Sequence, residues 1–347
     1  MSPTLSAEQL AGVLAEHAAA TDTKGQALTV LTTKGISHDH WRIGDSGLVL
    51  RIPRMSQWGM APDAQLSYEA TAFTRAAASG HCPTLRDTVP VCETLPRGAL
   101  IVDLIDGRPP RLPEDLDAIA DSFVAIHQLP VPDAANQPPL QSHAAPLAAT
   151  LQVIEEQAAF LPEAQLSNDA RTAFDDELAW AREFASHGEP DIALCLVGTD
   201  THPGNFLIDR TGKAWFVDLE KALYGVPPID LAHATLAVAT GWDPDCAARL
   251  TTSQTAAFYR RYLERVGPAR AGELRPWLIP LRRLTWLRTM TWFARWQAAW
   301  QGGDHPASRD AAMSEHITAH IAASFEANMI ADARADWLEP ALSEALS

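Results

Sequence analysis

Long apolar runs are missing from this 347-residue sequence. No run approaches the roughly 18 residues that a membrane-spanning helix needs. The first residues also lack a basic segment followed by an apolar core, which a secretion signal would have. We therefore expect a cytoplasmic protein without a membrane partner.

Close cysteine pairs and basic residues are also scarce. The four cysteines, Cys82, Cys92, Cys195 and Cys246, are far apart in sequence, which is typical of reduced thiols rather than of a disulfide framework. Only 27 Lys and Arg stand against 43 Asp and Glu, a net charge of −16. Binding to nucleic acid needs clustered basic side chains, so we expect no nucleic-acid partner.

The composition is that of a soluble globular protein, with 47% apolar and 20% charged residues. The length fits two lobes better than one core. Charge is uneven, because residues 1–105 carry a net charge of −2 and residues 106–347 carry −14. The acidic part has two interpretations, a solvated surface or a pocket that attracts a cation.

The N-terminal part has the pattern of a small antiparallel sheet. Ser6 and Gln9 form a capping-box pattern before a helical stripe. Short β-prone runs separated by turn residues follow, with one helix among them. The expected strands are 28–31, 41–43, 48–52, 89–92 and 99–104, the helix is 64–79, and residues 106–110 close the region.

From Leu116 onward the pattern is mostly helical, with helices expected at 147–160 and 166–186. Residues 192–217 return to strand and loop, and helix resumes beyond Asp230. The expected fold class is therefore α+β, with an N-terminal lobe over residues 1–105 and a mostly helical C-terminal lobe over 106–347.

Three polar residues lie in the β-rich insert of the second lobe. Pro203-Gly204 forces a tight loop between Asp200 and Asn205, and a hairpin then carries the chain to Asp218. This arrangement can bring the three side chains to one place. Phosphoryl transfer needs such a set, with one carboxylate for the acceptor hydroxyl and oxygen ligands for Mg²⁺.

The same stretch resembles the signature of the aminoglycoside phosphotransferase and choline kinase family, in His202-Pro203-Gly204-Asn205, Asp218-Leu219-Glu220 and residues 224–232. The resemblance implies a two-lobed protein-kinase-like fold and a small-molecule kinase that uses ATP or GTP with Mg²⁺. It implies that Asp200 is the catalytic base, that Asn205 and Asp218 are metal ligands, and that Asp230 is structural.

One departure from the family pattern is plain. Gly198-Thr199 stands where the family usually has His-Gly. In kinases this histidine mainly braces the loop, so its loss puts the geometry of the loop in doubt. A nucleotide-binding pseudokinase or scaffold is therefore the alternative function.

The first lobe carries candidate nucleotide-binding residues. Gly35 and Ser37 lie in a turn between two strands, where a small residue lets backbone N–H groups approach a phosphate. Arg51 ends a strand and resembles the family's phosphate-pairing cation, and Glu69 on the next helix is its expected partner. Asp103 and Ile105 are expected to form the hinge that contacts the purine.

The acceptor is expected to meet the second lobe. Trp292, Trp296 and Trp300 share one helix face, which indicates either core packing or a cation–π wall. Glu220 follows the expected metal ligand by two residues. With the acidic charge of this lobe, these residues favour a small hydroxyl compound with an amine, either a metabolite or an antibiotic.

Overall fold

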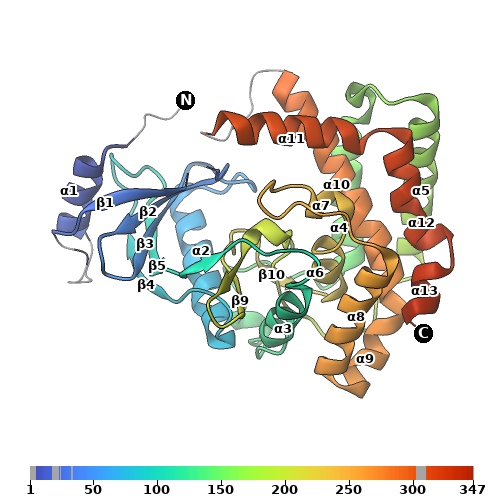
Figure 1. The fold of residues 1–347 in the computed structure, drawn as a ribbon, viewed down its shortest axis with the longest axis horizontal. Helices are drawn as coiled ribbons and strands as arrows, with labels where there is room; N and C mark the ends of the chain where they lie inside the picture. Colours follow the sequence, from blue (N-terminus) through green and yellow to red (C-terminus); the bar gives the residue numbers. More distant parts are fainter. Residues whose placement is uncertain (1–4, 18–22, 24, 33, 302–309, 347) are drawn as a thin grey trace.

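The computed structural model describes residues 5–17, 23, 25–32, 34–301 and 310–346. The side chain of Trp300, the third tryptophan of the predicted stripe, lies outside the described part. A sheet forms one end of the molecule and a larger helical region forms the other, as Figure 1 shows. The predicted α+β class with two lobes is confirmed.

The N-terminal sheet has five antiparallel strands in the order β1-β2-β3-β5-β4. Four predicted strands are confirmed, but the strand predicted at 89–92 is wrong. The strand there ends at Val89 because Pro90 follows it and lacks the N–H that a ladder needs. The strands are β1 (Leu28–Thr32), β2 (His38–Ile43), β3 (Leu48–Pro53), β4 (Leu85–Val89) and β5 (Ala99–Asp103).

The two faces of this sheet pack against different helices. Helix α1 (Ala7–His17) begins with the predicted capping box, in which Ser6 and Gln9 hydrogen-bond each other's backbone N–H. Leu50 packs with α1 on one face, while Val49 packs on the other with α2 (Pro62–Ala76). Since side chains alternate along a strand, Arg51 of β3 shares the face of Val49.

Between residues 103 and 107 the chain leaves the N-terminal sheet and pairs with a strand of the C-terminal part. Strand β6 (Gly107–Arg108) pairs with β8 (Phe206–Asp209) of the C-terminal part instead of with the N-terminal sheet. The segment predicted as a closing turn thus contains a short strand. The lobe boundary between residues 105 and 106 remains a prediction.

The C-terminal part is helical, and α10 (Leu278–Gln301) runs through its centre against α4 and α6. Trp286 of α10 is fully buried. No described helix is both long and apolar enough to cross a membrane. The other helices are α3 (Leu116–His127), α4 (Pro146–Ala158), α5 (Asn168–Ser186), α6 (Pro228–His233), α7 (Ala237–Thr240), α8 (Thr252–Val266), α9 (Pro268–Leu274), α11 (Ala311–Ser324), α12 (Ala327–Leu338) and α13 (Ala341–Leu346).

A buried carboxylate joins three of these helices. Glu177 of α5 is fully buried and contacts Arg283 of α10 at 2.6 Å and Arg334 of α12 at 2.8 Å. Glu155 and Arg182 form a comparable pair at 2.9 Å in solvent, between α4 and α5.

Replacing Glu177 by alanine should lower the free energy of unfolding by about 3–5 kcal/mol, because it leaves Arg283 near a desolvated site without its partner and removes the closer of the two carboxylates of Arg334. Glu155→Ala should change it by less than about 1 kcal/mol, because the pair is solvated. Urea titrations of both variants measure the difference. Equal losses in the two variants would contradict the role of Glu177.

Candidate active site

The loop that carries Asp200 is held by one buried carboxylate. Asp230 of α6 accepts hydrogen bonds from the N–H groups of Gly198 and Thr199, both at 2.8 Å. His127 lies 3.0 Å from the same carboxylate. Asp230 is only 1% exposed, so these donors satisfy a charge that water does not reach. The loop follows β7 (Cys195–Val197), which pairs with β10 (Leu223–Gly225).

The two residues that depart from the family pattern fit this loop. Thr199 has φ +58°, a conformation that β-branched residues rarely adopt. Its hydroxyl donates to the carbonyl of Lys221 at 2.9 Å, and its carbonyl accepts from Arg288 at 2.8 Å. At Gly198 an added Cβ would lie 2.7 Å from the ring of Phe216. The loop therefore has a brace without the missing histidine.

The structure brings Asp200, Asn205 and Asp218 together. Asn205 lies in the short 3-10 helix Pro203–Asn205, and its side-chain amide donates to the backbone carbonyl of Asp200 at 2.8 Å. The hairpin of β8 and β9 (Ala214–Phe216) then returns the chain, and the N–H of Val217 donates to Asn205 at 3.0 Å. Asp218 follows directly.

Both carboxylates are held in the charged form. Burial raises the pKa of Asp200, but the charge of Lys221 at 2.6 Å holds it well below its usual range. Burial also raises the pKa of Asp218, and Arg51 at 2.5 Å is the main group that holds it low. The charge of Asp200 raises the pKa of Asp218, so the two carboxylates lie close enough to interact.

A histidine links the predicted Arg51–Glu69 pair. Arg51 Nε lies 3.8 Å from Glu69, too far for a hydrogen bond. His38 lies between them, with Nδ1 3.1 Å from Arg51 and Nε2 3.0 Å from Glu69. A guanidinium can only donate, so Nδ1 accepts and Nε2–H donates to Glu69. His40 accepts from Arg51 in the same way at 3.1 Å.

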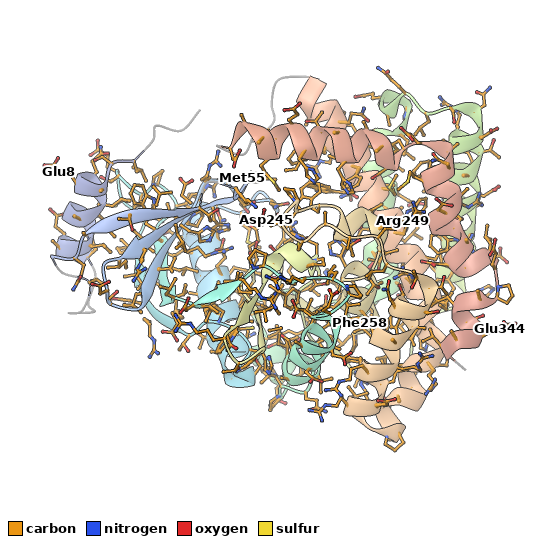
Figure 2. The ribbon with its side chains drawn as sticks, viewed as in Figure 1. Glu8, Met55, Asp245, Arg249, Phe258 and Glu344 are labelled. Atoms are coloured by element: carbon orange, nitrogen blue, oxygen red, sulfur yellow. The ribbon has the colours of Figure 1, made fainter. Side chains whose placement is uncertain are left out.

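The predicted phosphate turn lies between β1 and β2. Gly35 is needed there, because an added Cβ would lie 2.5 Å from the carbonyl oxygen of His38. Ser37 is buried, and its hydroxyl accepts from Gln57 at 2.9 Å. Lys34 of this turn pairs with Asp243 at 3.4 Å and with Asp245. Asp245 lies where the helical region meets the sheet, as Figure 2 shows.

The two predicted hinge residues lie apart from this network. The side chain of Asp103 contacts Arg86 at 2.6 Å, and its N–H donates to Thr84 at 3.0 Å. Ile105 is partly exposed between β5 and β6. No contact recorded among the described residues joins Asp103 or Ile105 to Asp200 or Asp218.

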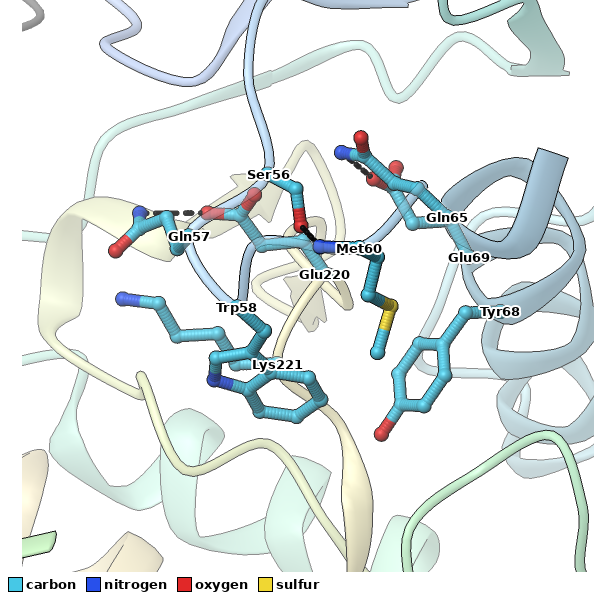
Figure 3. Close-up of a pocket in the computed structure, with 9 residues that line it drawn as sticks. All are labelled: Ser56, Gln57, Trp58, Met60, Gln65, Tyr68, Glu69, Glu220 and Lys221. Carbon is cyan, nitrogen blue, oxygen red and sulfur yellow. Dashed lines mark hydrogen bonds between the residues drawn. The ribbon is translucent and has the colours of Figure 1, made fainter. Parts of the chain in front are cut away.

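Glu220 lines a pocket beside this network, shown in Figure 3. Its carboxylate accepts from Gln57 at 2.9 Å and lies 3.7 Å from His38. Burial, with the charge of Asp218, raises the pKa of Glu220 to about 7. The residues that line the pocket are Ser56, Gln57, Trp58, Met60, Gln65, Tyr68, Glu69, Glu220 and Lys221.

The predicted tryptophans of α10 belong to an aromatic cluster. Trp292 and Trp296 lie 5.2 Å apart, and Trp242 packs against them at 5.7 and 6.0 Å between ring centroids. The Nζ of Lys221 lies 5.7 Å from the centroid of Trp292. Core packing, one of the two predicted roles, is thus present. The cation over Trp292 is a lysine of the chain, and a wall for an amine of the acceptor remains a prediction.

Sequence reasoning missed His38 as a bridge, Lys221 as the partner of Asp200, and Arg288 as a support of the loop. The position of Lys221 could have been predicted to lie near the site, because it directly follows Asp218-Leu219-Glu220. Arg288 lies four residues before Trp292 and so shares its helix face. Nothing in the sequence joins His38 to residues 51 and 69.

The donor set fits a hard cation such as Mg²⁺. The side-chain nitrogen of Asn205 donates a hydrogen bond to the backbone carbonyl of Asp200. The amide oxygen of Asn205 therefore faces away from that bond and can act as a metal ligand. Asp218 offers its second carboxylate oxygen. His38, Glu69 and Glu220 also converge, with ligand atoms within 4.8 Å of one another, but Arg51 already supplies a cation there.

Comparisons with known proteins bear on the family and the fold. A sequence model of the phosphotransferase enzyme family matches residues 30–277, whereas a search of curated proteins gives no match. A choline/ethanolamine kinase family protein from Mesorhizobium loti is similar in structure, with 20% identity, a TM-score of 0.55 and coverage of 96% of this chain and 97% of that chain.

Two further solved structures are similar. An ethanolamine kinase from Plasmodium vivax has 11% identity and a TM-score of 0.62, with 94% of this chain and 89% of that chain covered. A thermostable mutant of an aminoglycoside phosphotransferase, in a ternary complex with AMP-PNP and hygromycin B, has 18% identity and a TM-score of 0.53, with 90% and 97% covered. Identities this low show the fold alone.

The fold and the site define a two-lobed, kinase-like phosphotransferase. Because the family model matches most of its length, the chain belongs to the phosphotransferase enzyme family.

Adding a methyl group at Gly198 should destabilise the protein by about 1–3 kcal/mol, because the new Cβ would overlap the ring of Phe216. The matched control is Gly272→Ala in α9, where an added Cβ meets nothing within 4 Å. That change should stabilise the protein by roughly 0.5–1 kcal/mol, because alanine lowers the conformational entropy of the unfolded chain. Chemical unfolding compares the two, and a stabilising Gly198→Ala would show that the loop has room for a side chain.

Proposed function

We propose that this chain transfers the γ-phosphate of ATP, in the presence of Mg²⁺, to a hydroxyl group of a small molecule. The main support for the proposal is that Asp200, Asn205 and Asp218 lie together on one hydrogen-bonded loop and the hairpin that follows it. A protein that only binds nucleotide has no use for a positioned carboxylate next to the metal ligands. The backbone bonds to Asp230 weigh against the pseudokinase alternative.

The reaction assigns one role to each group. The oxygen of the acceptor hydroxyl forms a bond to the γ-phosphorus, the bond from this phosphorus to the bridging oxygen breaks, and ADP leaves. Asp200 orients the hydroxyl and receives its proton. Its low pKa makes orientation the larger part of this role, because a weak base removes a proton only late in the transfer.

Asn205 and Asp218 would hold the metal ion, and Arg51 would pair with the phosphates as the fixed cation of β3. Mg²⁺, when bound, neutralises the charge of the phosphate oxygens. His38 keeps Arg51 in place by linking it to Glu69. The solved ternary complex with AMP-PNP supports ATP as the donor.

Asp200→Asn should lower turnover by about 10²–10⁴-fold, the usual effect of losing a positioned general base, while the affinity for Mg²⁺–AMP-PNP stays near normal. The assay measures ADP release over a panel of small alcohols. Asp332→Asn removes a carboxylate from an exposed pair with Arg249 and should leave turnover unchanged. Parental turnover in Asp200→Asn would remove its assigned role.

Asp218→Asn should weaken binding of AMP-PNP by roughly tenfold or more when Mg²⁺ is present, because the ion loses an anionic oxygen. Asn205→Ala should act in the same direction with a smaller effect. Calorimetric titrations with Mg²⁺ and with EDTA separate the metal from the nucleotide. The same loss of affinity in EDTA would mean that Asp218 does not act through a metal.

A further inference from the structure

A lysine of the chain occupies the acceptor end of the site. Lys221 Nζ lies 2.6 Å from Asp200 and 5.7 Å from the ring centroid of Trp292. Its side chain is 18% exposed and lines the pocket of Figure 3. An ammonium group above a tryptophan and beside a carboxylate is the arrangement in which proteins bind amine ligands. Here the protein supplies the amine itself.

We propose that Lys221 determines which charge the site prefers in its acceptor, and that the acceptor hydroxyl compound carries an anionic group which pairs with Lys221. This proposal rests on the function proposed above. An amine-bearing acceptor would have to displace Lys221 from both Asp200 and Trp292. A carboxylate or phosphate group on the acceptor would instead gain a charge-assisted hydrogen bond.

Asp200, Asp218 and Asp243 each have a cation of the chain beside them. Asp200 has Lys221, and Asp218 has Arg51 at 2.5 Å. Asp243 has Lys34, which also contacts Asp245.

The other two acids of the network have hydrogen-bond donors beside them but no cation to themselves. Glu69 has His38 at 3.0 Å and Arg51 at 3.8 Å. Glu220, the candidate acceptor contact in the sequence, is held by Gln57 and lies 3.7 Å from His38. Each of these acids is therefore engaged by a group of the chain, and an incoming amine would have to compete with a contact that is already made.

A second cation approaches from α10. Arg288 precedes Trp292 by one helical turn, and its guanidinium donates to the carbonyl of Thr199, next to Asp200. Lys221 stays charged, because burial lowers its pKa but Asp200 and Glu220 raise it above the usual value. The acceptor end is therefore more positive than the charge of −14 over residues 106–347 suggested.

That net charge lies largely elsewhere. Acids such as Glu156, Asp175 and Glu183 are exposed on α4 and α5, where they form a solvated surface. Of the two interpretations drawn from composition, the structure supports the surface over an acidic pocket. The expectation of an amine-bearing acceptor rested on that charge together with Glu220 and the tryptophans, and our proposal departs from it.

The test uses two simple ions, malonate and tetramethylammonium, so that it does not require the true acceptor. Thermal unfolding is followed at constant ionic strength while either ion is titrated, for the parent chain and for Lys221→Met. The parent should show a saturable shift with malonate and none with tetramethylammonium. Lys221→Met should weaken the binding of malonate by about tenfold or more, which corresponds to the loss of one charge-assisted hydrogen bond. The same variant should also be stabilised by tetramethylammonium, because Trp292 is then free to bind this cation.

The matched control is Lys213→Met. Lys213 also lies over a tryptophan, 4.0 Å from the ring centroid of Trp215, but in the β8–β9 hairpin. This variant should keep the parental response to both ions. A general salt effect would move all three proteins alike and would count against the proposal, as would a parent that responds to tetramethylammonium or fails to respond to malonate.

Nucleotide binding is measured in the same experiment. AMP-PNP with Mg²⁺ should stabilise the parent and Lys221→Met equally, because Lys221 lies at the acceptor end. If the nucleotide fails to bind while the ions behave as expected, the proposed function is wrong and the charge preference of the site stands. If the nucleotide binds and the ions show no such selectivity, the role of Lys221 is wrong and the phosphotransfer proposal is unaffected.

Discussion

The position of Asp200 depends on the buried carboxylate of Asp230. Two backbone N–H groups of the loop and the ring of His127 surround this carboxylate, and Tyr262 of α8 hydrogen-bonds the other nitrogen of that ring at 2.9 Å. A buried charge is tolerated only when such donors surround it, so the loop and the helix that carries Asp230 depend on each other. The strained backbone of Thr199 is held by the same arrangement.

Local patterns in the sequence were sufficient for most of the fold and for the proximity of the three candidate active-site residues. Asp200, Asn205 and Asp218 are joined by a short loop and one hairpin, so turn chemistry alone predicted their meeting. Alternation along β3 likewise places Arg51 inward. The bridge of His38 and the contact between Lys221 and Trp292 depend on how strands and helices pack, which sequence spacing does not encode. The strand predicted at 89–92 failed for a local reason, the proline at position 90.

Net charge was a poor guide to the site because it does not record where charges are neutralised. Glu177 is fully buried between two arginines and contributes nothing to an external field, whereas the exposed acids of α4 and α5 are screened by solvent. If the acceptor binds beside Asp200 as proposed, the cations nearest to it are Lys221 and Arg288. Distance and burial therefore decide more than totals.

The contact of Lys34 with Asp243 and Asp245 joins the turn above β2 to the segment after α7. One end of this bridge lies at the expected phosphate site, and the other follows Trp242 of the acceptor-side aromatic cluster. If a bound nucleotide draws Lys34 toward its phosphates, the carboxylates of Asp243 and Asp245 lose their contact with this lysine. The affinities for the two substrates are then linked, and by thermodynamic reciprocity each substrate changes the affinity for the other by the same factor.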